Sequence, residues 1–456
     1  MKKKILTILL SSAMIFSMGI STVSAAAADD TAATESTVVS RTDGVTDTTS
    51  GKVRGFIDDG TYTFRGIPYA KADRFEMPEA PDSWDGIRNC LVYGSTAPIT
   101  KMTDPDGGDF IIPHRYWAQS ENCQNLNVWT QDLDTNAKKP VMVWFHGGGF
   151  YNGSSIEGVA YDGKNLSEYG DVVVVTVNHR LNVLGYMDLS DYGEDYQYSG
   201  NCGTADLVAS LKWVKENIAN FGGDPDNVTI FGQSGGGCKV LNMFATSEAE
   251  GLFDQAVVQS GGEGHIDQDI AKKVTAKTLE ILGISDNEVE QLKEVPYDTL
   301  DAAATEAQKQ VGEELGTSVG WSPVLDEDYL HTDFLDWTND VPVMVGSVFG
   351  EMNCWTALDP NETNKNSWTD EEVDAKLTEK YGDKAEAVKE AFLKAYPEKS
   401  ACDAYYVSNR TGDFGTLAKR LESGDNKNYN YLVSYESPLD GGVNLWHCGE
   451  IPFVFH

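Results

Sequence analysis

The chain has 456 residues, 41% of them hydrophobic and 23% charged, and its formal net charge is −36 at pH 7. Such a negative charge repels phosphate backbones and anionic lipid headgroups, so nucleic acids and acidic membrane surfaces are excluded as expected partners. A chain of this length and apolar content can bury a large core, and no linker or internal repeat divides residues 41–456. We therefore expect one large domain over these residues.

The first residues have the pattern of an export signal. Three lysines follow the initial methionine, and an apolar stretch and then small residues come next. This order predicts a secretory signal peptide over residues 1–27, cut after Ala25 or Ala27. Serines interrupt the apolar stretch, which is also shorter than the ~20 residues of a membrane span. We expect a secreted protein without membrane insertion, in which residues 28–40 form a disordered lead-in.

The seven cysteines form neither a dense disulfide framework nor a paired zinc motif, although an exported protein permits disulfides. The one bridge that we expect joins Cys90 to Cys123, and the other thiols are interpreted as structural or free. The acidic run at residues 104–109 does not fit the EF-hand calcium loop and is interpreted as a turn.

Short runs of β-branched and aromatic residues recur along the chain, with helical patterns such as 204–219 between them. The runs are continuous rather than alternating, as in central strands of a parallel sheet that is buried on both faces. Alternation of strand and helix predicts a doubly wound α/β fold. Two charged amphipathic segments, 266–304 and 369–396, are expected to form a helical cap. The expected strands are 141–145, 172–177, 228–231, 256–258, 343–345 and 431–435.

A serine flanked by glycines follows the expected strand 228–231, within the segment Gly-Gln-Ser-Gly-Gly-Gly at 232–237. Glycine two residues before and two residues after the serine, between a strand and a helix, is the pattern of a nucleophile elbow. The turn leaves no room for flanking side chains, and its strain presents the hydroxyl above the edge of the sheet. Ser234 is therefore the candidate nucleophile. The alternative is a glycine-rich turn with an idle serine.

A serine hydroxyl needs a base to take its proton, and that base needs a carboxylate to orient it. In the chain order of α/β hydrolases, the acid and the histidine follow the serine on loops after later strands. Glu351, just after the strand 343–345, is the expected acid, with a surface glutamate as the alternative. His447, after the strand 431–435, is the expected base. Three other histidines are less suitable by position: His265, His331 and His456.

Three consecutive glycines follow His146 at the end of the expected strand 141–145. Glycines let backbone N–H groups face a developing oxyanion without obstruction by side chains. Gly148 and Gly149 are the expected donors, together with Gly235 after the nucleophile. The segment has neither of the two glycine-rich phosphate-loop patterns, so nucleotide binding is not expected.

These motifs together resemble the type-B carboxylesterase and cholinesterase family. The resemblance implies an α/β-hydrolase fold with a mostly parallel central sheet, flanking helices and helical cap insertions. It implies the catalytic serine, acid and histidine and the three oxyanion donors named above, with no cofactor or metal. It also suggests two buried structural ion pairs, Glu121–Arg180 and Arg74–Asp206. The landmarks, in order, are residues 64–70, 121–128, 146–150, 178–181, 200–206, 217–225, 259–261 and 447–455.

Four features depart from that family's pattern. Gln233 stands where cholinesterases carry a glutamate, which removes a negative charge and weakens the case for choline esters. Gly235 replaces the usual alanine but keeps its N–H group. Cys448 replaces the glycine after the histidine. The chain stops at His456 where relatives continue through further helices, so we expect either a fragment or a short form.

The resulting expectation is a secreted serine carboxylesterase that acts on small-molecule esters. Two alternatives stay open: a catalytically weak or silent binding or adhesion protein on the same fold, and a hydrolase of amide, carbamate or polymer-linked esters. Fold alone does not decide between them. The oligomeric state and the acyl and alcohol preference are not specified. Four aromatic residues are candidates either for a substrate pocket or for the core: Phe150, Trp321, Phe349 and Trp355.

Overall fold

The computed structural model describes residues 37–99, 115–351, 364–408, 410–422, 424, 427–438 and 441–455. Residues Thr37–His456 form one compact unit. The predicted signal peptide, the acidic run at 104–109, Cys354, Trp355 and His456 lie outside the described residues.

The folded unit begins a few residues before the end of the predicted lead-in. The N–H of Val38 donates to the carbonyl oxygen of Ile57 at 2.7 Å, and the N–H of Ile57 donates back at 2.8 Å. Residues 37–40 are therefore part of the folded unit, because this pairing fixes their backbone against a strand.

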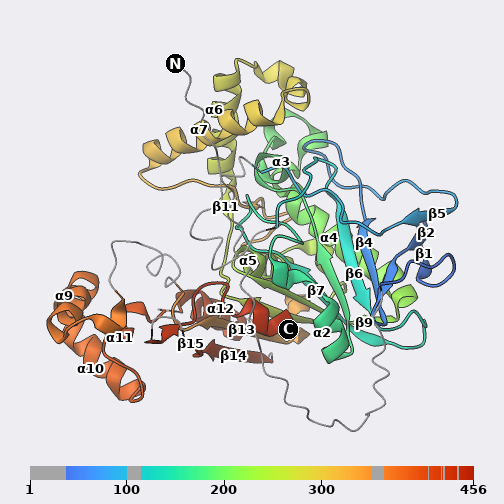
Figure 1. The fold of residues 1–456 in the computed structure, drawn as a ribbon. Helices are drawn as coiled ribbons and strands as arrows, with labels where there is room; N and C mark the ends of the chain where they lie inside the picture. The colour runs from blue at the N-terminus through green and yellow to red at the C-terminus, as the bar shows by residue number, and fades with distance from the viewer. Residues whose placement is uncertain are drawn as a thin grey trace, which may run out of the picture. The chain divides into compact units, whose positions relative to one another are not determined.

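A nine-stranded mixed sheet forms the centre of the fold (Figure 1). Neighbouring strands are parallel from β14 to β8, whereas β6, β4 and β3 continue the sheet in antiparallel pairs. All six predicted strands lie in the parallel part, which confirms the α/β class. The antiparallel part was not predicted. Across the sheet the strands are β14 (Asn428–Val433), β13 (Val343–Val348), β10 (Gln255–Gln259), β9 (Gly223–Gln233), β7 (Lys139–Phe145), β8 (Val173–Val177), β6 (Asn125–Thr130), β4 (Thr61–Pro68) and β3 (Phe56–Asp58).

The continuous apolar runs form strands that are buried on both faces. In β7, Val143 and Phe145 pack into one core, while Trp144 between them packs into a second core on the opposite face. Successive side chains on a strand point to opposite faces, so a strand covered on both sides needs apolar residues at every position. The first core includes Leu207 and Leu211 of a flanking helix, and the second includes Phe455.

Helices cover the sheet, and α4 and α5 both pack against β9 (Figure 1). The predicted helix at 204–219 is confirmed, but it begins two residues earlier. It ends before Gly222, whose φ of 76° is typical of a helix C-terminus. Across the described ranges, the helices are too short or too polar to cross a lipid bilayer. The helices around the sheet are α2 (Lys164–Gly170), α3 (Asn182–Tyr186), α4 (Cys202–Asn217), α5 (Gly235–Phe244), α12 (Thr411–Glu422) and α13 (Ile451–Phe455).

Two helical insertions leave the sheet at the carboxyl ends of its strands, which is the edge where Ser234 lies. After β10 come α6 (Gln268–Leu282) and α7 (Tyr297–Leu315), which pack against each other. After β13 come α9 (Asp370–Tyr381), α10 (Ala385–Ala395) and α11 (Asp403–Tyr406), drawn in orange in Figure 1 and packed around Phe349. The predicted helical segments are thus present, and both emerge on the side of the candidate site.

Smaller sheets complete the structure. A three-stranded sheet contains β1 (Val45–Thr48), β2 (Gly51–Arg54) and β5 (Ile87–Asn89), and two pairs contain β11 (Ile266–Asp267) with β12 (Val324–Leu325) and β15 (Glu436–Ser437) with β16 (Val443–Asn444).

Candidate active site

Ser234 lies in a strained turn between β9 and α5. Its φ is 57° and its ψ is −124°, a backbone conformation that non-glycine residues rarely adopt. The turn is held by the Ser234 N–H, which donates to the carbonyl oxygen of Gln259 at 2.8 Å. A Cβ atom on Gly232 would lie 2.5 Å from the carbonyl oxygen of Gly236, and a Cβ on Gly236 would overlap the carbonyl of Phe145. The flanking glycines are therefore a steric requirement of this turn.

Glu351 and His447 are hydrogen-bonded to each other, with 2.6 Å between Oε2 and Nδ1. The backbone repeats the contact, because the His447 N–H donates to the Glu351 carbonyl at 3.1 Å. The other carboxylate oxygen accepts from Ser260 Oγ at 2.7 Å and from the Val348 N–H at 2.9 Å. With its carboxylate so held, Glu351 orients the ring with a proton on Nδ1 and leaves Nε2 as the basic nitrogen.

One residue of the elbow, Gln233, contacts the ring of His447. The side-chain Nε2 of Gln233 lies 3.4 Å from both ring nitrogens, so the amide packs against the ring rather than onto one lone pair. The Cys448 thiol donates to Oε1 of the same glutamine at 3.0 Å. The side chain directly before Ser234 therefore links the nucleophile's turn to the loop that carries the histidine.

The segment Gly147–Gly149, named here the glycine loop, lies beside the nucleophile. A Cβ on Gly147 would be 3.6 Å from the Cβ of Ser234, and a Cβ on Gly235 would be 2.5 Å from the Cα of Gly149. Gly148 and Gly149 have φ values of 84° and 62°, which glycine adopts without strain. Gly235 is the first residue of α5, where helical N–H groups have no partner within the helix. The three predicted donor residues are thus close together around the elbow.

Residues 42–456 match the profile of the carboxylesterase family. The chain belongs to this family. It is 42% identical to an esterase from the anaerobe Clostridium hathewayi that can hydrolyse aliphatic aromatic polyesters, with a TM-score of 0.83 over 92% of this chain and 84% of that chain.

Two curated relatives are also esterases or hydrolases by name. The para-nitrobenzyl esterase of Bacillus subtilis (strain 168) is 40% identical over 258 residues, which are 56% of this chain and 51% of that protein. The match therefore spans about half the length of that relative. The phenmedipham hydrolase of Pseudarthrobacter oxydans is 29% identical over 422 residues, which are 90% of this chain and 82% of that protein.

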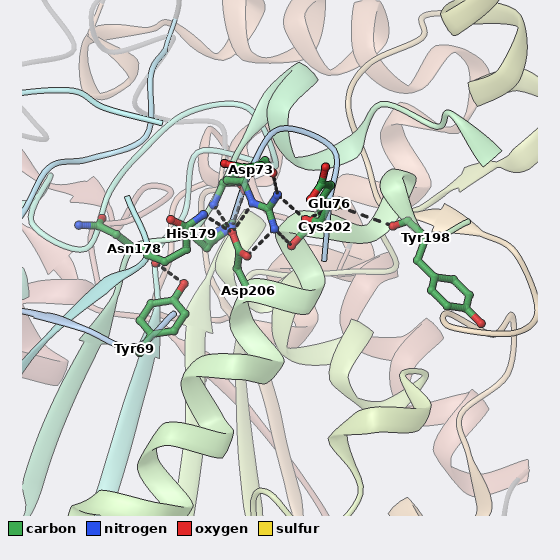
Figure 2. A network of polar contacts seen from close by, with 10 residues as sticks. Tyr69, Asp73, Glu76, Asn178, His179, Tyr198, Cys202 and Asp206 are labelled. Carbon is green, nitrogen blue, oxygen red and sulfur yellow. Dashed lines mark hydrogen bonds and ion pairs between the residues drawn. The ribbon is translucent and has the colours of Figure 1, made fainter. Parts of the chain in front are cut away.

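One buried and one partly buried ion pair hold the loops around the site of this carboxylesterase-family protein, but the two predicted pairings were wrong. Arg180 pairs with Asp206, with Nη2 2.7 Å from Oδ1 and Nε 2.9 Å from Oδ2 (Figure 2). Arg74 pairs with Glu121, with Nε 2.6 Å from Oε2. The partners are exchanged because Arg180, just after β8, lies next to the first turns of α4, which carry Asp206. Burial opposes the charge of Arg180, yet Asp206 keeps its pKa above the usual value.

The predicted Cys90–Cys123 disulfide is also wrong, because neither cysteine is bonded. Cys90 belongs to the large core under the sheet, whereas Cys123 packs with Ala97 and Leu181 in a separate cluster. Burial raises the pKa of the Cys90 thiol to about 12, so it stays protonated at neutral pH.

Other candidate residues lie elsewhere. His331 Nε2 is 2.9 Å from the hydroxyl of Ser247, and His265 is half-buried with a pKa lowered by burial. Among the aromatic candidates, Phe349 is fully buried against Phe392 and Tyr396, so it belongs to the core.

Two further aromatic candidates also pack into the structure. Phe150 is buried beside Tyr186, and Trp321 packs against the helical insertion that contains α6 and α7. In the described part of the chain, no group of His, Cys, Asp and Glu is arranged to hold a metal ion.

Two further charged groups near the site had no clear signal in the sequence. Glu450 is buried, and this burial together with the negative charge of Glu351 raises its pKa to about 7. Lys239 is buried on α5, five residues after the nucleophile. An isolated lysine or glutamate in a helical pattern usually indicates a solvated face, so only the packing identifies these two.

Proposed function

We propose that this protein is a serine carboxylesterase that hydrolyses carboxylic esters through an acyl-enzyme on Ser234. The observation that carries the proposal is the 2.6 Å hydrogen bond between His447 and Glu351, on loops that meet the strained turn of Ser234. The glycine loop beside this turn supports the same chemistry, because acyl transfer needs N–H donors where the carbonyl oxygen becomes negative.

The chemistry follows from the position of each group. His447 takes the proton of the Ser234 hydroxyl as the oxygen attacks the ester carbonyl, and Glu351 stabilises the imidazolium. The N–H groups of Gly148, Gly149 and Gly235 stabilise the tetrahedral oxyanion. His447 then protonates the departing alkoxide, which leaves as an alcohol. A water molecule, deprotonated by the same histidine, attacks the acyl-serine, and the carboxylic acid is released.

The substrate class that we propose is neutral esters, with polymer-linked esters as a second candidate. Gln233 places an uncharged amide against His447, so this position provides no carboxylate for a cationic alcohol group. The Clostridium hathewayi esterase, whose title gives aliphatic aromatic polyesters as substrates, supports the polymer-linked candidate. Release of soluble acid from a polyester film, compared with turnover of para-nitrophenyl esters, distinguishes the two.

We also propose that the protein is exported. The support is the basic start, short apolar stretch and small residues at the N-terminus. Expression of the full chain in a secreting bacterial host should give mature protein in the medium, cut after Ala25 or Ala27. N-terminal sequencing measures the cut, and an uncut chain retained in the cells would contradict export.

The test of the central proposal uses a short-chain para-nitrophenyl ester and a fluorophosphonate label. Wild type should turn over the ester and be labelled on Ser234, and Ser234→Ala should lose both while its melting temperature stays close to that of wild type. A folded wild-type protein that is neither labelled nor active would favour a binding or adhesion protein on this fold. Label on Ser234→Ala would show that another residue is the nucleophile.

A further inference from the structure

Lys239 is a buried lysine that the mechanism above does not use, and burial lowers its pKa to about 7. Its side chain is 1% exposed, and its Nζ donates to the carbonyl oxygen of His146 at 2.8 Å. Among the residues that the structure describes, it forms no ion pair with a carboxylate. Burying a lysine without a counter-ion costs stability. A buried lysine that is retained despite this cost in stability is a candidate for a functional role.

The acceptor of this hydrogen bond is the residue directly before the glycine loop. Because a trans peptide unit is planar, the carbonyl of one residue and the N–H of the next point in opposite directions. A hydrogen bond that holds a carbonyl therefore also aims the following N–H group. Lys239 holds the carbonyl of His146 and so aims the N–H of Gly147.

The next two peptide units are held in the same way. The His146 ring Nδ1 donates to the Gly147 carbonyl at 2.8 Å, and the Asn152 N–H donates to the Gly148 carbonyl at 2.9 Å. These bonds aim the N–H groups of Gly148 and Gly149, the two loop donors. The carbonyls of three consecutive residues, 146 to 148, thus each accept a hydrogen bond, and Lys239 donates the first of these bonds.

The surroundings of Lys239 leave this carbonyl as its main polar partner. The ring of Phe150 lies 6.0 Å from Nζ. The imidazoles of His146 and His179 are stacked 5.0 Å apart, and burial followed by the charge of Lys239 lowers both of their pKa values well below the usual one. Both histidines therefore stay neutral, and the Gly147 carbonyl oxygen, which can only accept, fixes the His146 proton on Nδ1. A negative charge on Cys238 or Glu157 would raise the pKa of Lys239 and so favour its ammonium form.

We propose that Lys239 is a positioning residue for ester hydrolysis: by holding the His146 carbonyl from behind, it keeps the glycine loop oriented toward the oxyanion. The inference rests on the proposed serine mechanism. It assigns Lys239 no contact with the substrate, so the residue acts through the loop. Its loss should weaken binding of the transition state while leaving binding of the ground state almost unchanged.

The competing explanation is that Lys239 only fills space in the core. A core-filling role predicts lower thermal stability and less folded enzyme, but an unchanged kcat for each active serine. Met243, fully buried on the same helix and outside the loop contacts, provides the matched control. Met243→Ala should lower the melting temperature and leave the kcat for each active serine as in wild type.

The experiment compares wild type with K239M, K239R and M243A in the full chain, with active serines counted by fluorophosphonate titration. K239M should lower kcat about tenfold to a hundredfold with little change in KM, because an oriented oxyanion donor is worth about 10²–10³ in rate. The affinity for a trifluoromethyl ketone, which forms an oxyanion adduct on the serine, should fall by the same factor. K239R keeps a charged donor and should recover part of the loss.

The outcomes separate this inference from the function on which it rests. Wild type labelled on Ser234, together with a K239M whose kcat for each active serine is unchanged, overturns the role of Lys239 alone. Wild type without label or turnover overturns the proposed function and this inference with it. If K239M does not fold, K239L replaces it as a second variant without a donor. K239L with an unchanged kcat and inhibitor affinity would again overturn the inference.

Discussion

The backbones of Gly235 and Gly149 touch, so that a Cβ on Gly235 would lie 2.5 Å from the Cα of Gly149. The glycine loop therefore leaves no room for a side chain on the residue that follows the nucleophile. The alanine that the sequence resemblance leads one to expect at position 235 does not fit this arrangement without movement of the loop.

We predict that Gly235→Ala lowers kcat about tenfold or more, because the added methyl group pushes Gly149 and its N–H away from the oxyanion. Steady-state kinetics for each titrated serine measures the effect. Gly415→Ala is the control, since a Cβ there meets open space on the exposed side of α12. That change should leave kcat unaltered and stabilise the helix by about 0.5–1 kcal/mol. An unchanged kcat in Gly235→Ala would mean that the loop adapts without loss.

We predict that Glu351→Gln lowers kcat by about 10³–10⁴, because a neutral amide neither fixes the tautomer of His447 nor stabilises its positive charge. Asp326→Ala is the comparison. Its Oδ1 accepts the N–H groups of Asp328, Tyr329 and Leu330, so its loss should lower the melting temperature but not kcat. Steady-state kinetics and thermal melts of both variants test this prediction. Equal losses of kcat would show that Glu351 is not the acid.

We predict that Gln233→Glu raises the preference for cationic esters. The change introduces a carboxylate where the amide now lies 3.4 Å from the ring nitrogens of His447. A negative charge in a partly buried site attracts a quaternary ammonium by Coulomb interaction. The ratio of kcat/KM for butyrylthiocholine to that for a neutral butyrate ester measures the shift. The same ratio in wild type and variant would show that position 233 does not contribute to specificity.

We predict that Glu450→Gln changes how stability depends on pH. The folded-state pKa of Glu450 is about 7 against a usual 4.5, so between these values the folded protein binds a proton that the unfolded chain has released. The raised pKa of Glu450 stabilises the folded protein fully below pH 4.5. This stabilisation is lost as the pH rises toward 7, by up to about 1.4 kcal/mol per pH unit. Glutamine does not titrate and should avoid this loss.

Urea unfolding at pH 5 and pH 8 tests the prediction for Glu450. The variant should gain stability relative to wild type at pH 8 and gain much less at pH 5. Glu194→Gln, at an exposed position, serves as the control and should follow wild type at both values. A constant difference between Glu450→Gln and wild type would show that Glu450 has an ordinary titration in the folded protein.

Local sequence patterns determined the fold class and predicted the candidate site residues and their order. The six parallel strands were predicted because burial on both faces demands apolar residues at every position, and such runs are visible without any contact information. The elbow was predicted because its turn excludes side chains on both sides of Ser234, which restricts the residues at 232 and 236 to glycine. Glu351 and His447 were predicted from their order and from their positions after strands.

Only the tertiary structure decided which residues meet across the chain. The family resemblance led us to assign Arg180 and Arg74 each other's carboxylates, because matching motifs do not show which loop packs on which. Cys90 and Cys123 were paired although they lie in separate clusters. Lys239 carried no signal at all, because burial of a lysine depends on what packs over its helix. Periodicity reports the face that a residue occupies, whereas pairing depends on distances set by the packed chain.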